Sequence, residues 1–332
     1  MSRKDLDSVY ANAKVVNFDQ NDKIVLISDV HRGDGTYSDS FVHNRNIYIA
    51  ALKYYLKNDY VYIEVGDGDE LWKNKNYNEI AYFYNDIYEI FNEFKNKIKN
   101  GKDEWIHCIY GNHDFIKKKK NFKEKQKKYL KKIDDNHGEE FIKFIDGIEY
   151  HEGINLRYTP LQEDILVTHG DQLDFFNYEA WKINMFLVRY IWRFLSGIAG
   201  FKDQTESAKS KTKRGHVDRK LENWAKENFK MIICGHTHKT RFPKKDEPPY
   251  FNIGCCVYPS YITAIEIENG KIQLVKWKID VNDDEGSELM KKLCKERSNR
   301  FLWVNKEVID GPSDISQHLL RAKEVRDRAR KS

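Results

Sequence analysis

The sequence has few cysteines and no apolar leader, and each absence narrows what the protein can be. The five cysteines follow no Cys-x-x-Cys spacing, which argues against a disulfide framework. The first residues lack the apolar segment of a secretory signal, so we expect a cytoplasmic protein. The cysteines are Cys108, Cys234, Cys255, Cys256 and Cys294.

The chain also lacks a strong charge of one sign and a clear membrane-spanning run. Its formal net charge of +5 over 332 residues suits an anionic substrate but does not by itself indicate nucleic acid. No segment combines the length and freedom from charge of a spanning helix, although residues 181–201 come close. The aromatic share of 14% argues against disorder, and the length allows a substantial core.

Short apolar runs alternate with helix-compatible segments, which predicts an α/β fold. The runs predicted to be strands are 23–28, 60–65, 105–110, 165–168 and 231–234. Residues 39–57 and 77–98 favour helices, and 250–279 favours a β meander with a hairpin turn at 268–271. The lysine-rich segment 117–132 is predicted to be a solvated helix or loop rather than a track for nucleic acid.

Each of the five apolar runs ends in a cluster of Asp, Asn, His or Gly. The carboxyl ends of strands in α/β sheets bring such side chains together, so we expect one site. Imidazole and oxygen donors suit Mn, Fe, Zn or Co. Seven donors suit two ions that share a carboxylate, and a hydroxide held between such ions can attack a phosphoryl group near neutral pH. The predicted ligands are Asp29, His31, Asp67, Asn112, His169, His236 and His238.

The order of these blocks resembles the calcineurin-like metallophosphoesterase superfamily. The blocks are Asp-x-His, Gly-Asp, Gly-Asn-His-Asp, a lone His before Gly, and Gly-His-x-His, within about 23–279. The resemblance implies a sandwich of two mixed β-sheets flanked by helices. It places Asp29, His31 and His238 on one ion, Asn112, His169 and His236 on the other, and Asp67 between them. It also implies that His113 protonates the leaving group and that Asp114 orients its ring.

A narrower resemblance concerns the segment Gly66-Asp67-Gly68-Asp69-Glu70-Leu71-Trp72. It is similar to the Gly-Asp-x-x-Glu-x-Trp block of the UDP-2,3-diacylglucosamine diphosphatase family. That family usually has Arg at the position of His113, so the exact substrate stays open.

A helical insertion is predicted at 172–228. Its stretch 181–201 carries Lys182, Arg189 and Arg193 on one predicted helix face among large apolar residues. Arg189 and Arg193 are candidate substrate-binding residues in a lid over the site, and the alternative is a core helix with one solvated basic edge.

The predicted function is hydrolysis of a phosphodiester or pyrophosphate bond by two divalent transition-metal ions, with manganese preferred. The expected substrate is a phosphorylated small molecule that is nucleotide-linked or lipid-linked, and a peripheral contact with the membrane is an additional expectation. Phosphomonoesterase or protein phosphatase-like activity and nuclease activity are alternatives, and a non-catalytic binding module is disfavoured because no ligand is missing. The catalytic domain is predicted over 1–285 and a charged helical extension over 286–332. The sequence indicates no oligomeric state.

Overall fold

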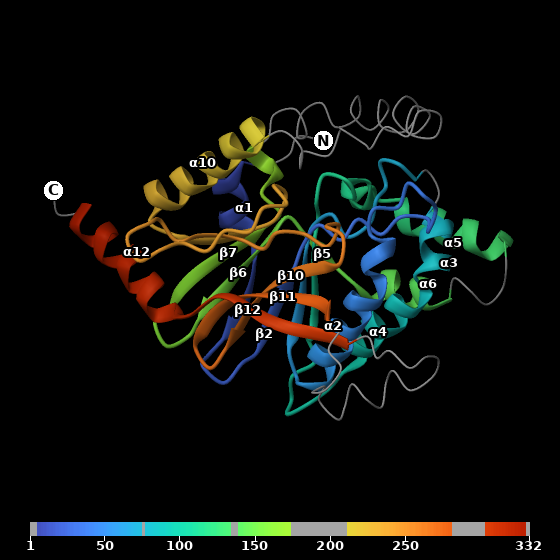
Figure 1. Cartoon of the computed structure of the whole chain (residues 1–332), viewed down its shortest axis with the longest axis horizontal. Helices are drawn as coiled ribbons and strands as arrows, with labels where there is room; N and C mark the ends of the chain where they lie inside the picture. Colours follow the sequence, from blue (N-terminus) through green and yellow to red (C-terminus); the bar gives the residue numbers. More distant parts are fainter. Residues whose placement is uncertain (1–4, 75–76, 134–138, 174–210, 281–302, 330–332) are drawn as a thin grey trace.

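Two mixed β-sheets pack against each other and carry helices on their outer faces (Figure 1). The computed structural model describes residues 5–74, 77–133, 139–173, 211–280 and 303–329. The five-stranded sheet has the order β1 (Lys14–Phe18), β6 (Gly153–Tyr158), β7 (Glu163–Thr168), β8 (Met231–Cys234) and β9 (Tyr250–Asn252). The seven-stranded sheet has the order β12 (Trp303–Asp314), β11 (Lys271–Asp280), β10 (Tyr261–Glu268), β2 (Ile24–Ile27), β3 (Val61–Val65), β4 (Ile106–Ile109) and β5 (Tyr150–His151). The predicted sandwich is confirmed.

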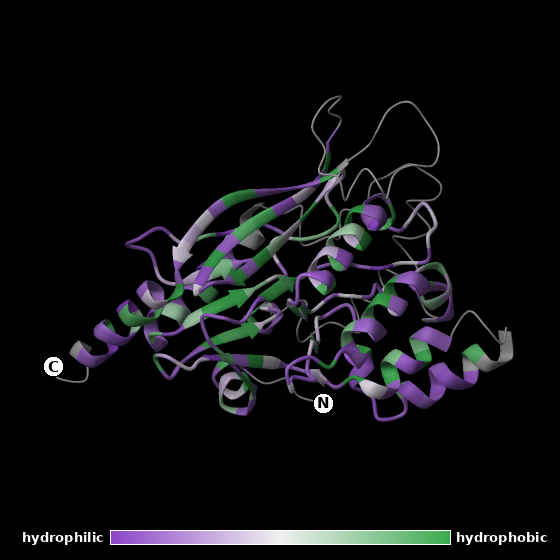
Figure 2. Cartoon of the chain, turned by 90° about the horizontal axis from the view of Figure 1, so that it is seen from below, coloured by the Kyte–Doolittle hydropathy of each residue, from purple (hydrophilic) through white to green (hydrophobic). Residues whose placement is uncertain are grey.

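The core lies between the sheets. Every residue of β2, β3, β4, β7 and β8 is buried, which explains why these segments read as continuous apolar runs rather than as alternating patterns. Leu26, Ile63, Ile165 and Ile233 belong to one apolar cluster that joins the two sheets. Figure 2 shows apolar residues concentrated on the central strands, whereas the outer helices are largely hydrophilic.

Helices cover both sheets. On the seven-stranded sheet, α2 (Arg45–Lys57) and α4 (Asn85–Asn96) contact the strands. Three further helices pack beside α4 and one another, namely α3 (Tyr77–Phe83), α5 (Phe122–Ile133) and α6 (Glu139–Gly147). The 3-10 turns of this region are η1 (Val42–Asn44) and η2 (Phe115–Lys118). On the five-stranded sheet, α1 (Leu6–Asn12) and α10 (Lys211–Asn228) share a second apolar cluster with β7 and β8. The turn η3 (Asp171–Leu173) follows β7.

The strand directions bring the predicted site together. Strands β2, β3 and β4 are parallel neighbours in one sheet, and β7 and β8 are parallel neighbours in the other. Within each sheet the loops that follow these strands therefore leave from one end. The two ends meet, because candidate ligands after β2 and β3 lie beside those after β7 and β8. The hairpin between β10 and β11 has its turn at the predicted position, because Glu268 pairs with Lys271.

The expectation of an entirely helical C-terminal extension is wrong for residues 303–314. This segment forms β12, which pairs antiparallel with β11, and only α12 (Ile315–Ala329) is helical among the described residues of the extension. The charged residues of this segment made its strand pattern difficult to recognise in the sequence. Lys306 pairs with the buried Glu266, and Val304 and Ile309 pack on the core. The boundary at 285 also cuts off core residues, because Ile315 and Leu319 belong to the main cluster.

Part of the predicted insertion can be placed. Residues 211–228 of the segment 172–228 form α10, whereas Arg189 and Arg193 lie outside the described residues. Within the part of the chain that the structure describes, no helix has the length and apolarity needed to cross a membrane.

Candidate metal centre

All seven predicted ligands lie at the carboxyl ends of five strands, and all are buried. Asp29 and His31 follow β2, Asp67 follows β3, Asn112 follows β4, His169 follows β7, and His236 and His238 follow β8. Five of the seven have a left-handed backbone, with φ between 50° and 67°. This conformation is uncommon outside glycine and concentrates at functional sites. The sharp turn that it produces directs each side chain back toward the end of the sheet.

The first group of donors consists of Asp29, His31 and His238, whose ligand atoms lie within 4.8 Å of one another. Asp29 Oδ1 lies 3.0 Å from His238 Nε2, and the Nε2 atoms of His31 and His238 are 3.3 Å apart. Asp29 Oδ1 is buried and accepts no hydrogen bond. A buried carboxylate oxygen facing two imidazole nitrogens is the arrangement that a divalent cation would satisfy.

The second group consists of Asp67, His169 and His236, again within 4.8 Å. His169 Nε2 lies 3.1 Å from Asp67 Oδ2 and 3.2 Å from Asn112 Oδ1. The Nδ1 atom of His169 is 3.0 Å from the carbonyl of Val65, which fixes this nitrogen as the donor and leaves Nε2 for a metal. Asp67 Oδ2 is also 3.7 Å from His31 Nε2, so this carboxylate lies between the two groups.

Each carboxylate has one oxygen held by the backbone and one directed at the imidazoles. The amide of His236 donates to Asp29 Oδ2 at 2.9 Å, and the amide of His113 donates to Asp67 Oδ1 at 2.8 Å. A β-carbon at Gly235 would overlap Ser28 and Asp29, and one at Gly111 would overlap Asp67. Glycine is therefore required at both positions for the loops to approach the carboxylates this closely.

The charges of the site depend on each other. Burial alone would raise the pKa of Asp29, but His238 and His169 lower it well below its usual value. Burial opposes the charge on His31, yet the neighbouring carboxylates of Asp29 and Glu70 raise its pKa to about 10. Burial likewise opposes the charge on His169, and Asp67 and Asp29 raise its pKa to about 10. The carboxylates thus attract positive charge, which protons provide in the absence of metal and which metal ions would replace.

The candidate acid His113 is held by two residues of the segment after β3. Glu70 Oε1 lies 2.9 Å from His113 Nδ1, and Glu70 Oε2 lies 3.2 Å from His31 Nδ1. The ring of Trp72 stacks on His113 with a centroid distance of 4.0 Å and an interplanar angle of 16°. The indole Nε1 donates to the carbonyl of Asn112 at 2.8 Å. One carboxylate therefore contacts both a candidate metal ligand and the candidate acid.

Asp114 occupies a different place from the one expected. Its Oδ1 accepts from the amide of Gly111 at 2.7 Å and its Oδ2 from Lys117 at 2.8 Å. The contact with the His113 ring that the sequence suggested for Asp114 is made by Glu70. The signal for Glu70 in the sequence is its position three residues after Asp67, within the segment 66–72.

A buried ionic network connects the loops beneath the centre. Arg32 donates to Asp69 at 2.8 Å and to Glu64 at 2.6 Å, and Lys117 pairs with Asp69 at 2.6 Å. All four side chains are almost fully buried. Buried charges are tolerated only when they are paired, so the network fixes the loops after β2, β3 and β4 relative to one another. Asp69 is consequently a partner in this network and not a solvated loop carboxylate.

Comparison with known proteins agrees with this geometry. Residues 22–240 match the family model described as calcineurin-like phosphoesterase. The chain belongs to this family. No curated protein matches the chain. The family is one of metal-dependent phosphoester hydrolases, and the donor groups found here fit that class. The narrower resemblance to UDP-2,3-diacylglucosamine diphosphatases stays a prediction.

Two solved structures are similar to the chain. One is a conserved protein from Streptococcus pneumoniae TIGR4 described as a predicted phosphoesterase, with 13% identity, coverage of 77% of this chain and 89% of that chain, and a TM-score of 0.33. The other is Vacuolar Protein Sorting 29 from Cryptosporidium parvum, with 13% identity, coverage of 87% and 98%, and a TM-score of 0.33.

Proposed function

We propose that the chain is a binuclear metal-dependent phosphoesterase that hydrolyses a phosphodiester or pyrophosphate bond, with Mn²⁺ as the preferred metal. The observation that carries this proposal is the pair of donor groups, Asp29 with His31 and His238, and Asp67 with His169 and His236. Asn112 adds an amide oxygen to the second group. Mixed imidazole and oxygen donors suit first-row transition ions.

The donors fit two ions. Asp29 Oδ1 has no hydrogen bond, and Asp67 Oδ2 faces ring nitrogens of both groups. When bound, two divalent ions lower the pKa of water and neutralise the charge of a reacting phosphoryl group. The backbone amides of His236 and His113 hold the other carboxylate oxygens, so the ligands need little rearrangement to bind.

In this proposal His113 gives a proton to the departing oxygen. Its Nδ1 is engaged by Glu70, which leaves Nε2 to face the substrate, and 19% of its side chain is exposed. Trp72 limits rotation of the ring by stacking on it. Glu70 is the positioning residue, since it fixes which ring nitrogen carries the mobile proton.

We further propose a nucleotide-linked or lipid-linked substrate. This rests on the sequence of 181–201, which follows His169 closely. Arg189 and Arg193 share one predicted helix face there, and large apolar residues make up most of the rest of the predicted helix. Arginine binds a second phosphate in bidentate fashion, and the apolar residues would receive a base or acyl chain. A cytoplasmic location with peripheral membrane contact is part of the same proposal.

The decisive experiment combines metal analysis with activity. Protein stripped of metal and reconstituted with Mn²⁺ should contain two ions and hydrolyse bis(4-nitrophenyl) phosphate. Asp67→Asn should remove at least one ion and most activity, because a neutral amide bridges two cations poorly. Asp164→Asn, at the other end of the strand that leads to His169, is the matched control and should keep both. One ion or none in the reconstituted wild type would contradict the binuclear proposal.

A further inference from the structure

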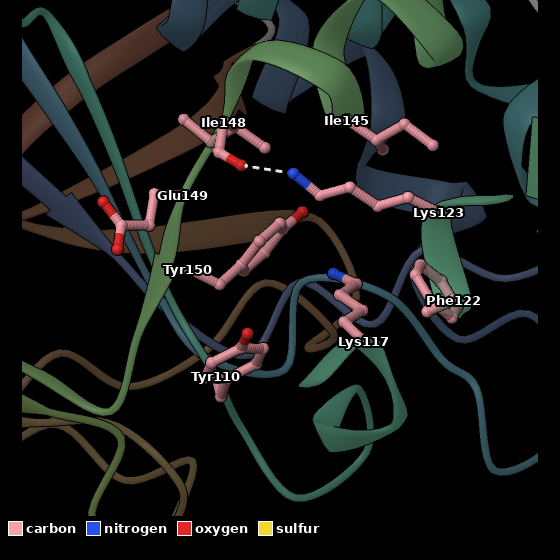
Figure 3. A pocket seen from close by; sticks show the side chains of 8 residues that line it. All are labelled: Tyr110, Lys117, Phe122, Lys123, Ile145, Ile148, Glu149 and Tyr150. Atoms are coloured by element: carbon pink, nitrogen blue, oxygen red, sulfur yellow. Dashed lines mark hydrogen bonds between the residues drawn. The ribbon is translucent and has the colours of Figure 1, made fainter. Parts of the chain in front are cut away.

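A cavity of about 270 Å³ lies beside the loop that carries Asn112 and His113 (Figure 3). It is open to solvent on one side and is lined by residues from the end of β4, η2, the first turn of α5, the end of α6 and β5. Ligand pockets for drug-sized molecules start at roughly 300 Å³, so this cavity suits a small organic molecule. The metal ligands do not line it.

One side of the cavity is apolar and the other is polar. Phe122, Ile145 and Ile148 are buried apolar residues on its wall. Lys123 donates to the carbonyl of Ile148 at 3.0 Å, which leaves two further N–H groups, and among the described residues no carboxylate forms an ion pair with it. Figure 3 shows the hydroxyl of Tyr150 directed toward Lys123.

The charge of the cavity favours an anion. Glu149 is the one carboxylate on the lining, and Figure 3 shows it directed away from Lys123. Lys117 also faces the cavity, with its ammonium 4.7 Å from the ring centroid of Tyr150. The charge of Lys117 is already matched by Asp69 and Asp114. The Lys123 ammonium and the Tyr150 hydroxyl would therefore bind a carboxylate or similar anion at one end, while the apolar wall would bind the rest of the molecule.

Lys117 connects the cavity to the metal centre. The same ammonium that faces Tyr150 pairs with Asp114, and Asp114 accepts from the amide of Gly111. Tyr110, which precedes Gly111, stacks on Tyr150 with a centroid distance of 5.4 Å. A molecule in the cavity would therefore touch both ends of the segment 110–117 that carries Asn112 and His113.

We propose that this cavity binds a small organic anion with an apolar body, and that its occupancy raises turnover at the metal centre by holding the segment 110–117. The binding part is independent of the proposed function. The effect on turnover rests on that function.

Binding can be measured with phenylacetate as the probe. Calorimetry on the full Mn²⁺-loaded chain should show one saturable site for phenylacetate and none for 2-phenylethylamine, which has the same body and the opposite charge. Lys123→Met should weaken binding about tenfold or more, since it removes a charged hydrogen-bond donor, and Lys123→Arg should retain binding. Tyr150→Phe keeps the ring and provides a second test if Lys123→Met unfolds.

Three results would overturn the binding site. They are the absence of saturable binding, equal binding of phenylacetate and 2-phenylethylamine, and phenylacetate binding that neither Lys123→Met nor Tyr150→Phe weakens. The last result would place the probe elsewhere, for example on the metal ions.

The effect on turnover needs a separate measurement. Saturating phenylacetate should raise the kcat for bis(4-nitrophenyl) phosphate about fivefold, the lower range of coupling between sites. Lys123→Met should keep the kcat measured without the probe and lose the response. Unchanged kcat with the cavity occupied would overturn the coupling. An inactive wild type would instead contradict the proposed function, and the calorimetric test would still stand.

Discussion

Replacing Glu70 with glutamine should separate the two functions of this carboxylate. Glu70 accepts at both ends, because Oε1 faces His113 Nδ1 and Oε2 faces His31 Nδ1. Both rings need an acceptor at Nδ1 so that Nε2 faces the metal or the substrate. Glutamine has the same shape but only one oxygen, so its NH₂ group must face one of the two rings. That ring then loses the tautomer that the site requires.

The size of the effect follows from the contacts. A hydrogen bond to a charged group contributes about 1.5–3 kcal/mol, which corresponds to roughly 10- to 100-fold in rate or affinity. The amides of Trp72 and Lys73 both donate to Oε1 at 3.2 Å, so the glutamine oxygen should stay at this position and its NH₂ group should face His31. We therefore expect weaker binding of the ion at His31 as the main defect, with a smaller loss in kcat.

The assay measures Mn²⁺ affinity and kcat for aryl phosphodiesters with good and poor leaving groups. Glu79→Gln is the matched control, because Glu79 is an exposed residue of α3 in the same region of the chain. It should behave as the wild type. If Glu70→Gln bound both ions with wild-type affinity and kept its kcat for both substrates, the argument from the two acceptor oxygens would be wrong.

Three other outcomes are expected, two from the site and one from the sequence of 181–201. His113→Ala should keep both ions and lower kcat by ~10²–10⁴, less for a good leaving group, and equal losses for all leaving groups would remove it as the acid. In metal-free protein the raised pKa values of His31 and His169 stabilise the fold below about 6.5, and this contribution is lost as the pH rises toward about 10. The Tm measured with a chelator should fall across that range, and a flat profile would contradict the charge assignment. Arg189→Ala with Arg193→Ala should raise KM for a lipid-linked pyrophosphate and leave a small aryl diester unaffected; equal effects on both would make the helix structural.

The sequence was sufficient to predict that the candidate ligands come together, because their positions depend on strand order. Apolar runs that end in Asp, His or Asn predict a shared site without any knowledge of side-chain contacts, and the strands before Asp29, Asp67 and His169 are where the pattern placed them. The role of Glu70 could not be predicted, since it depends on where two oxygens of one side chain point. Asp114, adjacent to the acid in sequence, was the simpler choice.

Lysine-rich segments were the least predictable part. The run 117–132 was expected to be solvated, and α5 has exposed lysines, yet Lys117 is buried with Asp69 and Asp114. The local sequence does not predict that Lys117 is buried, because its partner Asp69 comes from another loop. Strand β12 illustrates the same difficulty: Lys306 lies in the sheet because β10 supplies Glu266. Pairing between distant segments overrides the local preference in both cases.

The left-handed backbone at Asp29, His31, Asp67, His236 and His238 restricts how the metal preference could be redesigned. Among residues other than glycine, Asn, Asp and His adopt this conformation most readily, whereas β-branched and bulky residues strain it. Exchanges among Asp, Asn and His would change the charge or the donor atom and still suit this backbone conformation. A threonine at one of these positions would introduce a new ligand and would also distort the loop. A change in metal binding by such a variant could then not be distinguished from a change in folding. A library of variants for altered metal use should therefore vary these five positions only among Asp, Asn and His. Thiolate or longer carboxylate donors should be introduced at Asn112 or His169, because the backbone at these two residues is not left-handed.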